Sequence, residues 1–210
     1  MPSPPSARTT LPARTTRTTR AARRREELLD DLVELFLREG FLGLGVGDLA
    51  ARLRCSRSTL YLVAQSKEQI VLAVLRHFFR GAADRIEAKV ATEPDAGVRL
   101  AVYLRAVARE LAPASAAFYA DVAAYLPGRE IYAENTRHAA RRVQQLVAAG
   151  VAAGAMRPVD AAFVGSAVAT VMTAIQNGEI GEATGMADAA AYESLADLVM
   201  EGLRPAADRE

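Results

Sequence analysis

The sequence has almost no cysteine or histidine: Cys55 is the one thiol among 210 residues, and His77 and His138 are the two imidazoles. A single cysteine excludes an intramolecular disulfide, and these three residues are too few for a Cys/His metal cluster. Neither histidine is accompanied by the nucleophile and carboxylate that covalent or acid–base catalysis needs. We therefore expect a protein that is not an enzyme, with no catalytic residues, metal or cofactor.

Aromatic residues are also scarce, at 6% with no tryptophan, whereas apolar residues reach 51% and many of them are alanine. Alanine favours helices, and the sequence shows no β-strand alternation and no internal repeat. We expect an all-α protein of about nine helices. The lone cysteine and the lack of an apolar leader segment favour a cytoplasmic location.

One uncharged run, residues 161–178, reaches 18 residues, which is the lower limit for a membrane span. It contains hydroxyl and amide side chains, and many of its apolar residues are small. We therefore expect a buried interface helix here and no contact with a membrane.

Charge is distributed unevenly, although the net charge is only +1. Residues 1–25 hold seven arginines and no acidic residue, so the rest of the chain carries a net charge of −6. Residues 1–19 also contain four prolines and six threonines and have little to bury, which predicts a disordered basic arm. Such an arm is either a solvated tail or a contact to nucleic acid.

Apolar residues recur at helical spacing from Arg20 onward. Leu28, Leu32 and Phe36 share one face of the first predicted helix, and Gly40 is expected to end it in a left-handed conformation. The same spacing predicts further helices at about 47–53, 57–63, 67–91, 95–111, 113–125, 129–153, 160–177 and 187–203. A break is expected at Pro127-Gly128, and a loop is expected over residues 178–185.

Residues 46–66, VGDLAARLRCSRSTLYLVAQS, predict a helix-turn-helix at about 45–64. Ser56 and Ser66 are good N-caps for the helices that follow them. The start of the second helix carries polar and basic side chains, which suit the base edges and phosphates of DNA. The candidate DNA-binding residues are Arg54, Ser56, Arg57, Ser58, Thr59, Tyr61 and Lys67.

Residues 22–82 resemble the TetR family of transcriptional regulators in LLDDLVELFLREGF (28–41), DLAARLRCSRSTLY (48–61) and SKEQI (66–70). A weaker similarity follows in LVAAGVAAGAMRPVDAAFVGSAV (146–168). The resemblance implies a DNA-binding domain at 20–82 and a C-terminal ligand-binding and dimerisation domain at 83–205. It also implies a homodimer, a palindromic operator in double-stranded DNA, and a small-molecule effector that releases the DNA. We expect a repressor, with an activator or an effector-free nucleoid-type protein as alternatives.

Four positions depart from the family's pattern. Gly45 stands near a frequent Thr, and Arg54 stands where the turn often has Gly. Val63 and Ala64 replace an aromatic or His followed by Phe. One alternative is therefore a helical protein that binds ligands or proteins and has a weakened or lost DNA-binding head. Another is that the basic arm compensates by entering an adjacent minor groove.

Several C-terminal side chains are candidates for a largely apolar effector pocket. They are Tyr103, Phe118, Tyr119, Tyr125, Tyr132, His138 and Met172. Residues on the last two predicted helices are candidates for a two-fold dimer contact. They are Phe163, Ser166, Ala169, Thr170, Thr173, Leu195 and Val199. Each of these side chains is alternatively an ordinary core or surface residue.

Two smaller features each allow two interpretations. The glycine-rich stretch GLGVG, residues 43–47, suits a nucleotide-binding turn only after a β-strand, but a helical pattern precedes it, which favours a flexible joint. Cys55 lies between Arg54 and Arg57, whose charge would lower the thiol pKa and suit a redox sensor. Alternatively, Cys55 fills a small apolar position in the turn.

Overall fold

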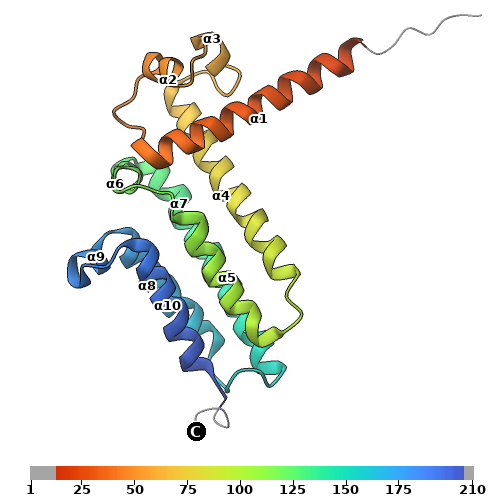
Figure 1. Cartoon of the computed structure of the whole chain (residues 1–210), viewed down its shortest axis with the longest axis vertical. Coiled ribbons are helices and arrows are strands. Elements are labelled where there is room, and N and C mark those ends of the chain that lie inside the picture. Colours follow the sequence, from red (N-terminus) through yellow and green to blue (C-terminus); the bar gives the residue numbers. More distant parts are fainter. Residues whose placement is uncertain (1–12, 206–210) are drawn as a thin grey trace, which may run out of the picture.

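The computed structural model describes residues 13–205, and this range contains helices and no strand (Figure 1). The helices are α1 (Ala13–Glu39), α2 (Val46–Arg52), α3 (Arg57–Leu60), α4 (Lys67–Ala91), α5 (Ala96–Leu111), α6 (Ala116–Ala124), α7 (Leu126–Ala152), α8 (Ala161–Gln176), α9 (Glu179–Thr184) and α10 (Asp188–Leu203). The prediction of an all-α fold is confirmed.

Helix α1 begins at Ala13, seven residues before the predicted start at Arg20. Pro12 is the last of the N-terminal prolines, so no pyrrolidine ring interrupts the backbone after it. The expected disordered arm at residues 1–19 is therefore corrected for residues 13–19, which continue the helix. Residues 1–12 of that arm lie outside the described part of the chain.

Two other predicted boundaries are also corrected. Helix α7 starts at Leu126 and runs through the predicted break at Pro127-Gly128. A proline is tolerated in the first turn because its missing N–H would have no partner within the helix there. Residues 179–184 form helix α9 inside the predicted loop, between Gly178 and Gly185, which are both left-handed. The described range thus holds ten helices instead of about nine.

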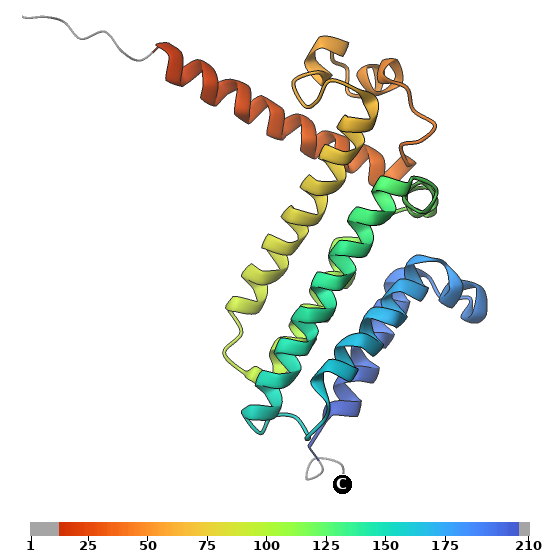
Figure 2. The same cartoon turned by 180° about the vertical axis from the view of Figure 1, so that it is seen from behind.

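The helices divide into a head and a body (Figure 1). The head consists of α1, α2, α3 and the first turns of α4, and the body consists of the rest of α4 with α5 to α10. Helix α1 crosses one end of the molecule, and α4 runs from that end along the body. Helices α8 and α10 lie on the far side of α5 and α7 from α4, and α6 lies against the C-terminal end of α1 (Figure 2).

The apolar stripe of α1 is buried as predicted, and it packs against α4 through residues such as Leu28, Leu32 and Phe36. Gly40 has a φ of +75°, and its N–H donates to the Phe36 carbonyl at 2.9 Å. The ring of Phe41 then packs on Phe36 at a centroid distance of 5.4 Å. The left-handed glycine thus turns the chain back into the core of the head.

The uncharged run forms α8, whose buried side packs on α7 and α10. At Gly165 the two helices α7 and α8 approach closely, since a Cβ on this residue would be 2.8 Å from the Ala140 carbonyl oxygen. Within residues 13–205, no helix combines the length and the apolar character that a bilayer crossing requires.

Candidate nucleic-acid interface and effector groove

The two predicted serine caps are confirmed. The Ser56 hydroxyl accepts the Thr59 N–H at 3.1 Å and begins α3, and the Ser66 hydroxyl accepts the Gln69 N–H at 3.2 Å and begins α4. Helix α3 ends at Leu60 and is shorter than the predicted 57–63. The caps fix both ends of the segment that presents the candidate DNA-binding residues.

The turn between α2 and α3 depends on a left-handed arginine. Arg54 has a φ of +49° and is the one non-glycine residue with positive φ in the described range. The Cys55 N–H donates to the Ala50 carbonyl at 2.9 Å, which closes the turn. This left-handed conformation costs a residue with a Cβ roughly 1–2 kcal/mol. The turn therefore has a backbone conformation that favours glycine, although Arg54 occupies the position.

The start of α3 presents a polar surface. The Ser56 hydroxyl lies 2.7 Å from that of Ser58 and 2.8 Å from that of Thr59. Arg57 is exposed, and a Cβ on Gly47 would lie 3.0 Å from its Nη2 atom, so the glycine leaves room for the guanidinium. Tyr61 is 41% exposed.

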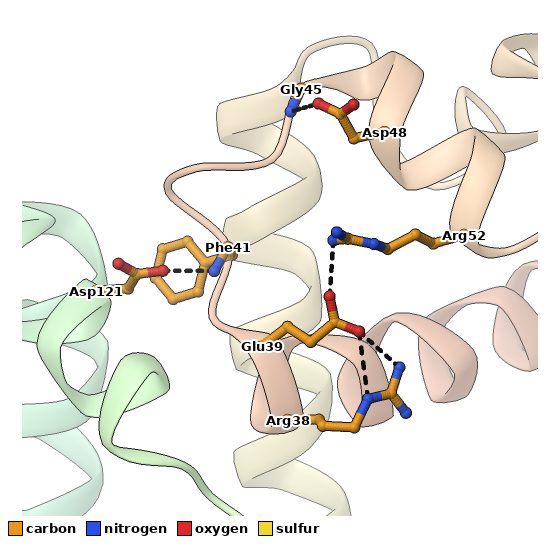
Figure 3. A network of polar contacts seen from close by, with 7 residues as sticks. All are labelled: Arg38, Glu39, Phe41, Gly45, Asp48, Arg52 and Asp121. Atoms are coloured by element: carbon orange, nitrogen blue, oxygen red, sulfur yellow. Dashed lines mark hydrogen bonds and ion pairs between the residues drawn. The ribbon is translucent and has the colours of Figure 1, made fainter.

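The basic side chains of the head divide into paired and unpaired groups. Arg52 pairs with Glu39 at 2.7 Å, and Glu39 also binds Arg38 at 2.9 Å, which fastens α2 to the end of α1 (Figure 3). Arg54 and Arg57 form no ion pair with any residue of the described range. Unpaired guanidinium groups at this edge are available for phosphates or guanine bases.

Lys67 is half-buried at the start of α4, and its Nζ donates to the Leu42 carbonyl at 2.7 Å. The ammonium has three hydrogens, so this bond leaves two for another acceptor. Lys67 thus links α4 to the loop between α1 and α2 and still has donors for a phosphate.

The departures from the family's pattern are accommodated in the head. Gly45 supplies no capping side chain, but its N–H donates to Asp48 Oδ2 at 2.7 Å (Figure 3). Val63 is buried in the core, and Ala64 packs against that core. Smaller side chains thus fill the positions where larger rings are frequent.

Cys55 is half-buried and packs on the core of the head. Burial is the main influence on the thiol, and it raises the pKa of Cys55 above its ordinary value. A redox-sensing thiol needs a lowered pKa. The structure therefore supports the packing interpretation of Cys55.

Helix α6 of the body is hydrogen-bonded to the end of α1 and to the loop that follows it in the head. Asp121 Oδ2 accepts the Phe41 N–H at 2.5 Å and the Leu42 N–H at 2.8 Å (Figure 3). The Ser115 N–H donates to the Leu37 carbonyl at 2.8 Å. A Cβ on Gly40 would lie 2.5 Å from the same Asp121 oxygen. Sequence analysis assigned no role to Asp121, because its partners are backbone groups about eighty residues away.

A groove of about 600 Å³ lies between α6, α7 and α8, and we call it the α6–α8 groove. Helices α7 and α8 separate beyond their contact at Gly165 (Figure 2). Its lining is Tyr119, Val122, Ala123, Arg129, Tyr132, Ala133, Thr136, Arg137, Ala140, Ser166, Ala169, Thr170, Thr173, Gln176 and Asn177. Its size is that of pockets for small organic ligands. Of the predicted effector residues, Tyr119 and Tyr132 lie here. Ser166, Ala169, Thr170 and Thr173, predicted as dimer contacts, line the same groove.

The other predicted effector residues lie elsewhere. Tyr103, His138 and Met172 line a smaller cavity of about 150 Å³ bounded by α4, α5, α7 and α8. Phe118 and Tyr125 line neither cavity and pack on Phe41, with ring centroids 6.3 and 6.2 Å away. Their rings join α6 and the residue that follows it to the head.

The predicted dimer residues are also divided. Phe163 on α8 is 73% exposed, but Leu195 on α10 is buried within the subunit, and Val199 is half-buried. Leu198, an apolar residue of the same predicted helix that is not among the predicted dimer contacts, is 72% exposed. Leu195 and Leu198 lie one turn apart, so the apolar spacing alone did not distinguish the inner from the outer side of α10. Exposed large apolar residues that form a contiguous patch are typical of contacts between proteins.

The sequence of the head matches a known protein family. Residues 28–74 match the family described as bacterial regulatory proteins, tetR family. The predicted resemblance to the TetR family is confirmed. No curated protein matches the chain. The matched segment runs from the buried stripe of α1 through α2 and α3 into α4, so it includes every candidate DNA-binding residue of the TetR-type head.

Solved structures share the whole fold. A TetR/AcrR-family regulator from Thermobifida fusca is 21% identical, with 87% of this chain and 99% of that chain covered and a TM-score of 0.63. PfmR, a TetR-family regulator from Thermus thermophilus, is 24% identical, with 85% and 99% covered and a TM-score of 0.58. A TetR regulator from Haloarcula marismortui is 14% identical, with 88% and 100% covered and a TM-score of 0.71. The chain therefore has the TetR-regulator fold in both head and body.

Proposed function

We propose that this protein is a transcriptional repressor that binds a palindromic operator as a homodimer and leaves the DNA when a small molecule occupies the body. The observation that carries the proposal is Arg57, which is exposed and unpaired at the first position of a properly capped α3. A guanidinium at this end of a recognition helix can bind guanine O6 and N7 together.

The state of the head argues against a lost DNA-binding function. The caps at Ser56 and Ser66 are formed, the turn at Arg54 is closed, and Val63 is buried in the core. Arg54 and Arg57 also leave two guanidinium groups without an ion pair in the described chain, where they can meet DNA. The departures at Gly45 and Ala64 change side chains without opening the core.

The dimer we propose uses the exposed apolar residues of α8 and α10. Phe163 and Leu198 supply large apolar surface on neighbouring helices. A two-fold contact of this kind places the same residues of both subunits against one another. The two α3 helices would then enter successive major grooves roughly 34 Å apart.

Release of the DNA requires that the effector distinguishes two states of the dimer, because a ligand shifts an equilibrium only through its differential affinity. Two elements connect the regions. Helix α4 belongs to both, and α6 lines the groove with Tyr119 while Asp121 holds the loop at Phe41 and Leu42. An effector that displaces α6 would therefore displace the end of α1 and change the spacing of the heads.

The test of DNA binding is a fluorescence-anisotropy titration with DNA from beside the protein's own gene, at two salt concentrations. We expect Arg57→Ala to weaken binding about tenfold to a hundredfold, the value of one two-point guanine contact. The control is Arg141→Ala, which removes an exposed arginine from the body. Equal binding of all DNA by wild type and both variants, lost in modest salt, would show phosphate attraction alone and contradict the proposal.

A further inference from the structure

The α6–α8 groove has positive charge and no negative charge. Arg129 and Arg137 of α7 both line it, and no aspartate or glutamate does. Neither arginine forms an ion pair within residues 13–205, whereas Arg142 on the same helix pairs with Glu87 at 2.8 Å. The two arginines are eight residues apart, so they are spaced about 12 Å along the helix axis. Unpaired guanidinium groups beside a groove favour an anion as its occupant.

The inner wall of the groove supplies hydrogen-bond donors. The buried hydroxyl of Tyr119 has no hydrogen-bond partner in the described chain. Tyr132 is only 8% exposed, and its hydroxyl interacts with that of Tyr192. The neighbouring Tyr192 hydroxyl already accepts the Gln176 amide at 3.0 Å. Burial raises the pKa of Tyr119 and Tyr132 well above the ordinary tyrosine value, so both stay protonated at neutral pH. A buried hydroxyl without a partner costs stability, and an acceptor on a ligand would remove that cost.

The rest of the lining consists mainly of small side chains, and it includes an alanine wall beside the hydroxyl groups of Thr136, Ser166, Thr170 and Thr173. Ala133 and Ala140 on α7 face the groove together with Ala169 on α8. Small side chains leave room for a ligand body, and the volume of about 600 Å³ suits a molecule of drug size.

We propose that the α6–α8 groove binds an amphiphilic organic anion. Arg129 and Arg137 hold its carboxylate, sulfonate or phosphate group, and its apolar body lies along the alanine wall towards Tyr132. The inference rests on the proposed function, because it names the chemical class of the effector that releases the DNA. A cationic effector is disfavoured, since the groove offers it no carboxylate and two like charges.

A matched pair of fluorescent probes tests the site. 8-Anilino-1-naphthalenesulfonate and N-phenyl-1-naphthylamine share an apolar body, and only the first carries an acid group. We expect the wild-type protein to bind the sulfonate at least tenfold more tightly than the neutral probe. The double variant Arg129→Gln, Arg137→Gln should lose this preference and keep its affinity for the neutral probe.

The control is Arg141→Gln, which removes a charge from the same helix outside the groove lining and should keep the preference. Circular dichroism and thermal unfolding establish that each variant folds. Equal affinity of the wild type for both probes would overturn the proposal. So would a sulfonate preference that survives in the double variant.

A second measurement separates this proposal from the proposed function. The sulfonate probe is added to the complex of protein and labelled DNA, and anisotropy reports release. Release from wild type but not from the double variant supports both proposals. A charge preference without release supports the anion site and contradicts effector control of DNA binding. If the protein binds its DNA but shows no preference for the sulfonate over the neutral probe, the anion site is overturned and the proposed DNA-binding function is unaffected.

Discussion

The head and the body place their proposed functional side chains in opposite environments. In the head, Arg57 and Tyr61 are exposed on a segment that Ser56 and Ser66 fix through neighbouring residues. In the body, Tyr132 is buried in a groove whose lining residues lie on three successive helices, between Tyr119 and Asn177. A DNA-binding surface can thus be encoded locally, whereas an effector site depends on how whole helices pack.

The two regions meet at a small junction. Phe41 packs against Phe118 and Tyr125, and Asp121 accepts the N–H groups of Phe41 and Leu42. Helix α6 contributes both to this junction and to the groove. If head and body act as one regulator, changes at this junction should affect both.

The largest effect on stability is expected from the ring of Phe41 at the junction. Phe41→Ala removes a fully buried ring and should lower the free energy of unfolding by about 3–5 kcal/mol. Urea unfolding followed by circular dichroism measures it, with Leu42→Ala as the control because that neighbouring side chain is exposed. A loss below about 1 kcal/mol in Phe41→Ala would show that this ring does not hold the regions together.

A smaller effect is expected when the hydrogen bonds of the junction are removed. Asp121→Ala leaves two N–H groups without their carboxylate and should cost about 1–3 kcal/mol of stability. It should also reduce the change in DNA affinity that the sulfonate probe causes. Asp197→Ala is the control, because it breaks only an exposed pair with Arg105. If Asp121→Ala changes neither the stability nor the effect of the probe on DNA affinity, α6 does not transmit effector binding to the head.

A still smaller effect, of opposite sign, is expected in the turn of the head. Arg54→Gly relieves the left-handed strain and should raise the free energy of unfolding by about 0.5–1 kcal/mol. The same substitution at Arg52, the last residue of α2 and the partner of Glu39, should lower it by about 1 kcal/mol. Urea midpoints with unchanged slopes measure both. A destabilising Arg54→Gly would contradict the strain assigned to the turn.

The smallest effect concerns the thiol beside this turn. Because burial raises the pKa of Cys55, less of the thiol is ionised at pH 7.5 than in the unfolded chain. Iodoacetamide should therefore react several-fold more slowly with the native protein than with the protein in urea, and the native rate should rise with pH. A faster native reaction would restore the redox-sensor interpretation.

The features that depend on neighbouring residues could be predicted from the sequence. The buried stripe of α1, the left-handed Gly40 and the caps at Ser56 and Ser66 all follow from spacing within one or two turns. The start of α1 at Ala13 and the start of α7 before Pro127 were predicted wrongly. A proline disrupts a helix only beyond its first turn, and Pro12 and Pro127 lie before and within the first turns of these helices.

The features that depend on packing could not be predicted in this way. Asp121 has no local signature, since its partners belong to the head. Arg129 and Arg137 both lie on α7, but their place in one groove depends on how α6 and α8 pack against that helix. Phe118 is of a residue type that is common in ligand pockets, but its ring is buried in the core of this fold.

The most direct test of the coupled regulator is a reciprocal titration. The affinity for the sulfonate probe is measured with free protein and with protein saturated by its operator DNA. Linkage requires that the DNA weaken probe binding by the same factor by which the probe weakens DNA binding. We predict weaker probe binding in the DNA complex, by that matching factor. Equal probe affinity in both states would contradict the proposed regulation.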